Sequence, residues 1–197
     1  MRHGESKVNV AEIILSHPKH GTHEDFTLTE NGEKQARDSA KKAKTEGLLN
    51  SETIIYSSPF SRCKKTAEIT KEVLGVSSEI YFDDRLRERF FGDFERTHNS
   101  NYRKVWDVDI NNPDHKDFSV ESAQEVQNMT LSLINDLEKK YSDKKLLLKK
   151  VKRLIGNRPI KSPKKKLKRC WCDLLCLARV LEEFVKSVMV GIWVEII

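Results

Sequence analysis

Residues Thr53–Gly75 decide the fold class, and they read TIIYSSPFSRCKKTAEITKEVLG. The stretch Thr53–Tyr56 is short, β-branched and aromatic, which predicts a strand buried on both faces. Ser58 followed by Pro59 predicts a helix start, with the serine as cap and the proline at the first helical position. The helix then keeps one face up to Gly75 through Ala67, Thr70, Val73 and Leu74. A buried strand that leads directly into a helix is typical of an α/β protein.

Similar elements lie on both sides of this stretch. Thr29 is a candidate cap for a helix over Glu33–Glu46, and Ser122 and Glu125 form a capping-box pattern before an apolar stripe. Ile80–Phe82 and Lys145–Leu148 are two further candidate strands. We therefore predict a three-layer α/β/α domain with a mainly parallel sheet over residues 1–148, incomplete in this chain, and active residues at the carboxyl ends of its strands. Residues 98–118 lack a clear period and predict an irregular insertion with a helical turn near Tyr102–Trp106.

Charge divides the chain of 197 residues at about residue 148. Residues 149–197 contain 13 Lys/Arg and 4 Asp/Glu, a net charge of +9, so residues 1–148 carry −3 of the total of +6. With 38% hydrophobic and 34% charged residues, the composition is that of a globular protein rather than a disordered or membrane-embedded chain. We expect one domain followed by an atypical basic, Cys/Trp-containing tail over residues 149–197.

The cellular compartment is predicted from cysteine usage and apolar segments. Only Cys63 lies in the first 148 residues, while Cys170, Cys172 and Cys176 cluster in the tail, so a disulfide framework is not expected. The start of the chain is charged and lacks the apolar stretch of a signal peptide. The apolar residues 187–197 number 11 and include Glu195, whereas a spanning helix needs about 20. These features predict a cytoplasmic protein without a membrane span.

Three segments suit phosphoryl chemistry. Arg2 and Arg62 can hold the oxygens of a phosphoryl group, because the guanidinium fork binds two oxygens at once. The neutral imidazole of His3 can attack phosphorus and form a phosphohistidine. A carboxylic acid such as Glu88 can protonate the leaving oxygen and later help to activate water.

Four motifs, in order, resemble those of the histidine phosphatases, also called the phosphoglycerate-mutase-like superfamily. The first is Arg-His-Gly-Glu-Ser at residues 2–6, followed by Asn9 where a phosphate-contacting asparagine is common. The others are LTENGEKQ at 28–35, SPFSRCKKTA at 58–67 and LRERFFG at 86–92. The resemblance covers roughly residues 2–148. It implies His3 as the nucleophile, Arg2, Asn9 and Arg62 as phosphate-binding residues, and Glu88 as the proton donor.

Two departures from the family pattern bear on activity. The family has a strand before Arg-His-Gly, whereas this sequence reads only Met1 there. The family also places Ser-His-Gly after a strand like Lys145–Leu148, and its histidine contacts the transferred phosphate. Here the chain continues Lys149-Lys150-Val151-Lys152, and no histidine follows His115. The abrupt change suggests a frame or splice change after residue 148, a hypothesis that the transcript and its alternative frames would test.

Other features have simpler interpretations that weigh against a functional one. His17, His20 and His23 are spaced by three, but Pro18 and Gly21 predict a solvated loop near the site rather than a metal site. Between 149 and 169 the chain has 11 basic residues and no acid, which leaves nucleic acid or anionic lipid open, although a solvated tail is favoured. The tail cysteines lack zinc-ligand spacing. Helical spacing from Leu174 to Val188 favours a small amphipathic helix.

The sequence thus predicts hydrolysis of small phosphomonoesters through a phosphohistidine, with no metal or organic cofactor. Mutase-type phosphoryl transfer is the alternative within the enzymes, and a non-catalytic phosphate-binding remnant is the alternative outside them. Loss of the second histidine predicts weak or absent turnover. The oligomeric state and the substrate's identity stay open.

Overall fold

The computed structural model describes residues 1–141 and 146–149, and its sheet is parallel. The strands are β1 (Ile54–Ser57), β2 (Tyr81–Phe82) and β3 (Leu146–Lys149), in the order β2-β1-β3. β1 pairs with β2 through Tyr56↔Tyr81 and with β3 through Ile54↔Leu146. All three predicted strands are therefore confirmed within one or two residues. The sequence predictions for residues 150–197 lie outside the described residues.

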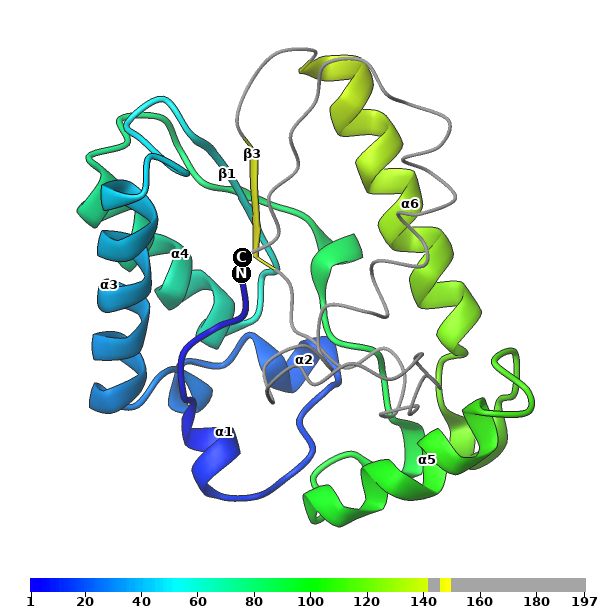
Figure 1. Ribbon diagram of the computed structural model, residues 1–197. Coiled ribbons are helices and arrows are strands. Elements are labelled where there is room, and N and C mark those ends of the chain that lie inside the picture. The colour runs from blue at the N-terminus through cyan, green and yellow to red at the C-terminus, as the bar shows by residue number, and fades with distance from the viewer. Residues whose placement is uncertain (142–145, 150–197) are drawn as a thin grey trace, which may run out of the picture.

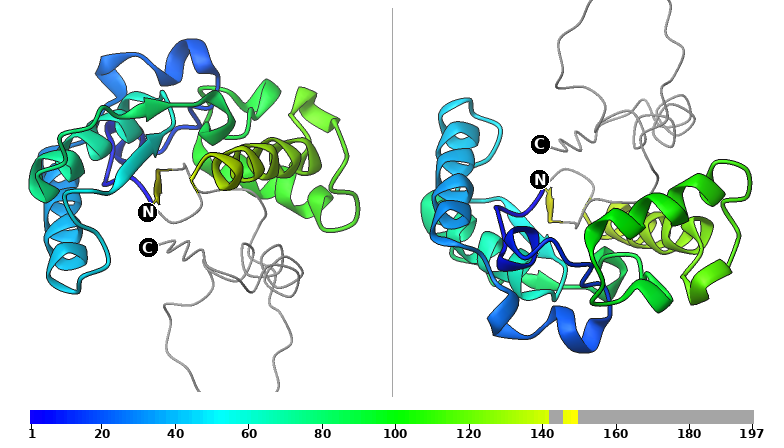
Figure 2. Two further views of the ribbon diagram at one scale, coloured as in Figure 1. Left: turned by 90° about the horizontal axis from the view of Figure 1, so that it is seen from above. Right: turned by 90° about the horizontal axis from the view of Figure 1, so that it is seen from below.

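Helices cover both faces of the sheet, as Figure 1 and Figure 2 show. Ile55 points to α3 (Glu30–Thr45) and α4 (Ser61–Leu74) and packs in a cluster with Ala43, Ala67 and Leu74. The neighbouring Ile54 and Tyr56 face α6 (Ala123–Lys140) and pack with Leu86, Leu133 and Leu137. Side chains alternate across a strand, so a strand with four buried residues needs cover on both sides. The predicted three-layer α/β/α architecture is confirmed.

Two of the three predicted helix starts are confirmed. The Thr29 hydroxyl accepts a hydrogen bond from the Gly32 N–H at 3.0 Å, and Ser122 and Glu125 form the predicted capping box. The start at Ser58 and Pro59 is wrong, because α4 begins at Ser61 after Phe60, which has no side-chain cap. The Ser58 hydroxyl instead accepts from the Phe60 N–H at 3.3 Å, a tight turn that delays the helix.

The insertion over 98–118 has more structure than its sequence predicts. It contains α5 (Tyr102–Asp109), an eight-residue helix where a single turn is expected. Tyr102 and Val105 bury one face of α5 against Ile14, Phe91 and Val120. Because polar residues occupy the other face of α5, this short apolar stripe is not evident in the sequence.

Short elements complete the described chain. They are α1 (Lys7–Val10), α2 (Pro18–Gly21), and the 3-10 helices η1 (Glu24–Phe26), η2 (Asp84–Leu86), η3 (Gly92–Phe94), η4 (Asn99–Asn101) and η5 (Asp117–Ser119). Among the described residues, none of the helices combines the length and the apolar character that crossing a bilayer requires.

Candidate active site

One cavity brings together all five residues that the sequence predicts for phosphate chemistry. Arg2, His3, Asn9, Arg62 and Glu88 line it. Arg62 follows β1 and Glu88 follows β2, so both come from the carboxyl edge of the parallel sheet. His3, Arg62 and Glu88 are buried, with exposed fractions of 8%, 3% and 3%, whereas Arg2 is exposed.

The backbone fixes the tautomer of His3. Its Nδ1 lies 2.6 Å from the carbonyl oxygen of Gly4, which can only accept a hydrogen bond, so Nδ1 carries the proton. In the neutral imidazole the lone pair then lies on Nε2.

The loop that carries His3 is docked on the first turn of α3. A Cβ added to Gly4 would lie 2.1 Å from the Gly32 carbonyl oxygen, and one added to Gly32 would lie 1.9 Å from that of Glu5. The two backbones thus touch where only glycine fits. The Glu5 N–H donates to Gln35 Oε1 at 2.9 Å, and the Thr29 N–H donates to the Glu5 carbonyl at 3.0 Å. The residues of the 28–35 motif therefore position His3 rather than line the cavity.

Asn9 has a divided role. With Ser6 it forms the capping box of α1, in which Asn9 Oδ1 accepts from the Ser6 N–H at 3.1 Å and the Ser6 hydroxyl at 2.9 Å. Its Oδ1 is thereby committed to the loop. The Nδ2 group is the part of this side chain that can donate to a phosphate oxygen.

Arg62 is held by neighbours that leave part of its fork for a ligand. Its Nη2 donates to the Leu15 carbonyl at 3.3 Å and lies 3.6 Å from Glu88 Oε2, while its guanidinium carbon lies 5.0 Å from the centre of the Phe60 ring. Its Nη1 is buried and has no hydrogen-bond partner among the described residues. A buried guanidinium N–H without an acceptor is costly, and a phosphate oxygen would satisfy it.

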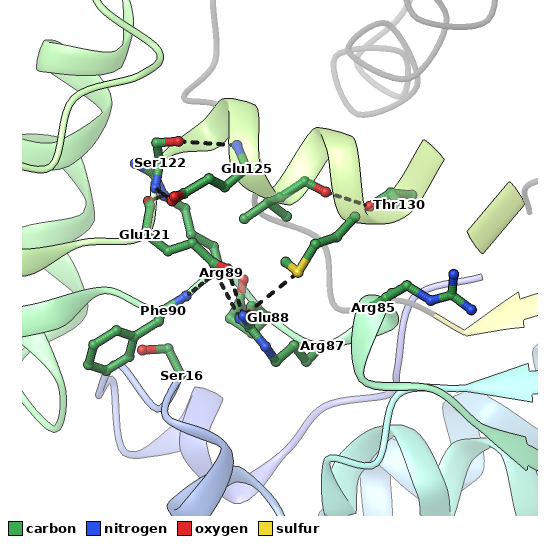
Figure 3. A network of polar contacts seen from close by, with 12 residues as sticks. Ser16, Arg85, Arg87, Glu88, Arg89, Phe90, Glu121, Ser122, Glu125 and Thr130 are labelled. Atoms are coloured by element: carbon green, nitrogen blue, oxygen red, sulfur yellow. Dashed lines mark hydrogen bonds and ion pairs between the residues drawn. The ribbon is translucent and has the colours of Figure 1, made fainter. Parts of the chain in front are cut away.

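Glu88 lies between two arginines that pair with other segments (Figure 3). Arg87 forms a two-pronged pair with Glu121, at 2.7 Å from Nη1 and 2.6 Å from Nη2, and the Glu121 hydrogen bonds raise the pKa of Arg87. Arg89 pairs with Asp109 at 2.6 and 3.0 Å, and both side chains are fully buried. His115 Nε2 also contacts Asp109, at 2.9 Å. The backbone at Glu88 is thus fixed on both sides.

Half of the residues that line the cavity have no motif in the sequence that marks them. These residues are Val8, Ile13, Leu15, Asn99 and Tyr102. Asn99 and Tyr102 come from the insertion, whose aperiodic sequence gave no signal for a cavity wall. Val8 lies one residue before Asn9, so a helix predicted over residues 7–10 would have pointed to it.

The histidine-rich segment is ordered by an acid from another part of the chain. The predicted loop at His17–His23 is wrong in part, because Pro18 opens the short helix α2. Glu95 Oε2 accepts hydrogen bonds from the Ser16 hydroxyl and N–H, and Glu95 Oε1 lies 2.9 Å from His20 Nδ1. Burial opposes ionisation of Glu95, but these hydrogen bonds outweigh it and lower its pKa. Across the described residues, no group of three or more His, Cys, Asp or Glu could hold a metal ion.

Comparison with known protein families identifies the family of this chain. The model of the histidine phosphatase superfamily (branch 1) matches residues 1–155. The chain belongs to the histidine phosphatase superfamily. It is similar to a probable phosphoglycerate mutase GpmB of Photorhabdus laumondii, with 41% identity over 96 residues that cover 49% of this chain and 39% of the relative. A probable GpmB of Cronobacter sakazakii is 34% identical over 140 residues, 68% of this chain and 60% of the relative. The chain thus spans less than two thirds of the length of these curated relatives.

Solved structures of other proteins agree with this chain in fold. Bacillus stearothermophilus YhfR superposes with a TM-score of 0.59 and 25% identity, over 79% of this chain and 73% of the other. A phosphoserine phosphatase mutant from Entamoeba histolytica, in complex with phosphoserine, gives a TM-score of 0.58 and 26% identity over 76% and 71% of the two chains. Members of the superfamily that resemble this chain therefore include both phosphatases and proteins named as mutases.

Proposed function

We propose that this chain is a phosphomonoester hydrolase that works through a phosphohistidine at His3. The observation that carries the proposal is the shared cavity, in which the Nε2-bearing imidazole lies among two arginines, an amide and a buried carboxyl group. Nucleophile, anion-binding groups and proton donor are the three parts that phosphoryl transfer requires. The substrate is a small phosphorylated molecule, and no step requires a metal or an organic cofactor.

The first step transfers the phosphoryl group to the protein. The lone pair of His3 Nε2 forms a bond to phosphorus while the bond from phosphorus to the leaving oxygen breaks. The electron pair of that bond goes to the oxygen, and the carboxylic acid of Glu88 gives it a proton, so that a neutral alcohol departs. Arg2, Arg62 and Asn9 hold the equatorial oxygens, whose charge they neutralise in the transition state.

The second step returns the protein to its starting state. Water attacks the phosphorus of phosphohistidine, the Glu88 carboxylate accepts the proton from this water, and the bond from phosphorus to Nε2 breaks. Inorganic phosphate leaves, and His3 and Glu88 regain their initial protonation states. The hydrogen bond from His3 Nδ1 to the Gly4 carbonyl supports the positive charge of phosphohistidine throughout.

The sequence after β3 sets an upper limit to the expected rate. The resemblance to the family implies a second histidine after a strand such as β3, whereas this chain continues with Lys149 and Lys150 and has no histidine after His115. By analogy with deletion of one oxyanion-hole donor, we expect turnover about 100- to 1,000-fold below that of a relative with both histidines.

His3 is the residue to test first. The full chain should hydrolyse p-nitrophenyl phosphate between pH 5 and pH 7, and His3→Ala should abolish that activity. His23→Ala is the matched control, because His23 is an exposed histidine outside the cavity. Turnover that survives His3→Ala would refute the nucleophile. Turnover absent from a well-folded chain would favour the phosphate-binding remnant.

The role of Glu88 is tested by comparing two substrates whose leaving groups differ in quality. Glu88→Gln removes the proton donor, which matters most when the leaving group is a poor one. We therefore expect a larger loss of kcat with an alkyl phosphate such as glycerol 2-phosphate than with p-nitrophenyl phosphate. Equal losses with both substrates would assign Glu88 a structural role.

Mutase activity is the second candidate, because the curated relatives are named probable phosphoglycerate mutases. In that reaction the phosphoryl group of phosphohistidine returns to an organic acceptor instead of water. The readout is interconversion of 2- and 3-phosphoglycerate followed by NMR, compared with phosphate release from the same mixture. Interconversion that exceeds phosphate release would replace the hydrolase proposal with the mutase.

A further inference from the structure

The part of the cavity wall that the proposed mechanism does not use is uncharged. It consists of Val8, Ile13, Leu15, Asn99 and Tyr102. Four of these side chains are aliphatic or aromatic, and the fifth is a neutral amide. Whatever is esterified to the phosphate must contact some of these groups, because the five candidate residues are committed to the phosphoryl group and its leaving oxygen.

Backbone contacts join the two segments of this wall into one surface. The Asn99 N–H donates to the Glu12 carbonyl at 2.7 Å, and the Ile14 N–H donates to the Thr97 carbonyl at 2.8 Å. Tyr102 is 5% exposed, and its ring packs on Phe91 and is stacked on Trp106. The wall is therefore a formed surface of the insertion and the segment before it.

Basic residues next to this wall are turned away from it. Arg103 and Lys104 follow Tyr102 directly, yet neither lines the cavity. The Arg103 side chain is 85% exposed and pairs with Asp107 at 3.7 Å, and the Lys104 ammonium lies 5.5 Å from the centre of the Phe94 ring. Among the described residues, the cations that line the cavity are Arg2 and Arg62.

The charge balance of the cavity then selects the substrate. Two arginines match the two negative charges of a phosphomonoester. A carboxylate or second phosphate on the same small molecule would enter a cavity that already holds the buried Glu88 and offers no further cation among the described residues. An unpaired charge in such a site is costly.

We propose that the site takes phosphomonoesters of uncharged alcohols or phenols and discriminates against phosphorylated acids, with Asn99 and Tyr102 as specificity-determining residues. This inference rests on the proposed function, because it assumes that the phosphoryl group lies at His3. It also separates the chain from an enzyme of phosphoglycerate, whose carboxylate needs a cation.

The test compares two substrates on the full chain. We expect kcat/KM for phenyl phosphate to exceed that for 3-phosphoglycerate by about tenfold or more, since one unfavourable charge contact of 1.4 kcal/mol gives a factor of ten. Asn99→Arg places a cation in the wall and should shrink this ratio, chiefly by lowering KM for 3-phosphoglycerate. Asn99→Gln is the matched control, which adds length without charge and should keep the preference.

Binding keeps the inference testable if turnover is absent. Calorimetric titration with phenylphosphonate and with 3-phosphoglycerate should show the same preference in the His3→Ala protein and in the unmodified chain. Failure of the proposed function would appear as no His3-dependent turnover of either substrate. The inference itself is overturned if 3-phosphoglycerate is preferred or equal in either measurement, if neither compound binds at millimolar concentration, or if Asn99→Gln shifts the ratio as much as Asn99→Arg.

Discussion

His3 and Glu88 face the same cavity, but the loop around His3 is held by backbone contacts whereas the segment around Glu88 is held by ion pairs. The His3 loop touches α3 at Gly4 and Gly32, where neither backbone leaves room for a Cβ. The Glu88 segment is anchored by Arg87 to Glu121 and by Arg89 to Asp109. One side of the site thus depends on close approach of main chains, and the other on charge.

The two ways of holding a segment respond to different changes. The close approach of the Gly4 and Gly32 backbones is disrupted by added volume, and neither residue has a side chain that titrates. A buried ion pair tolerates small changes of volume, but removal of one partner leaves the other charge buried and uncompensated. We therefore expect the His3 loop to respond to added side-chain volume and the Glu88 segment to the loss of a charged partner, whatever the distance of the substituted residue from the cavity.

Arg89→Met should have the largest effect on stability. It keeps much of the side-chain volume but leaves the Asp109 carboxylate, which is fully buried, without its guanidinium. We expect the free energy of unfolding, measured by urea denaturation, to fall by about 3–5 kcal/mol.

The matched control for Arg89→Met is Arg103→Met. Arg103 also pairs with an aspartate of α5, but the two side chains are 85% and 63% exposed. Such surface pairs contribute little, so this variant should unfold like the unmodified chain. Similar losses of stability in the two arginine variants would contradict the claim that the buried ion pair of Arg89 stabilises the fold. Adding Asp109→Leu to Arg89→Met should recover part of the loss, because it removes a buried carboxylate that keeps His115 but has lost its guanidinium.

Gly32→Ala tests the backbone-held side. The new Cβ would lie 1.9 Å from the Glu5 carbonyl oxygen, so the His3 loop must move. Alanine favours helix over glycine by about 1 kcal/mol, but overpacking should prevail with a net loss of about 1–3 kcal/mol. The loss should be equal at pH 6 and pH 8. Asn31→Ala, at an exposed position of the same turn, should not destabilise the protein. A stabilised Gly32→Ala protein would show that the contact is not needed.

Glu95, which lies beyond the Glu88 segment, makes the contact with Ser16 and His20 sensitive to acid. Its pKa is lowered in the folded state, so it contributes stability above its ordinary pKa of about 4.3, and this contribution is lost as pH falls through the folded value. Glu95→Gln should cost about 1–2 kcal/mol at pH 7, as for hydrogen bonds to a charged group. It should also flatten the stability curve between pH 5 and pH 3, measured by urea denaturation. Glu79→Gln, at an exposed position, should leave the slope of stability against pH unchanged. An unchanged slope in Glu95→Gln would show that Glu95 does not cause the loss of stability in acid.

The fold was predictable because buried strands and helix ends require particular residue types at particular positions in the sequence. β1 is apolar on both faces, as its four buried residues require, and Thr29 and Ser122 cap their helices as their side chains predict. The failure at Ser58 has a local cause, since its hydroxyl caps a turn instead of a helix. The sequence of α5 has no such clear pattern, because its short buried stripe is interrupted by charged residues.

Half of the cavity could be predicted and half could not, for physical reasons. A residue such as Arg62 or Glu88 is marked by its chemistry and its motif, because the proposed phosphoryl transfer needs a guanidinium for the phosphate and a carboxylic acid for the leaving oxygen. A wall residue such as Tyr102 is marked only by the packing of α5 on Ile14 and Phe91, which is a long-range property. The ion pair of Arg89 with Asp109 joins residues 20 positions apart and equally has no local sequence pattern.

Gln35→Ala should have the smallest effect on stability and the most local one. Gln35 is exposed, and its Oε1 accepts one hydrogen bond from the Glu5 N–H, so its loss should cost about 0.5–1 kcal/mol. Because this bond protects the Glu5 N–H itself, amide hydrogen exchange measured by NMR should quicken at Glu5 and stay unchanged in α4. Lys34→Ala, the exposed neighbour on the same helix, provides the control and should leave both rates as they are. Faster exchange across the Glu88 segment as well would contradict the separation of the two sides, because a change in backbone contacts would then loosen residues that ion pairs hold.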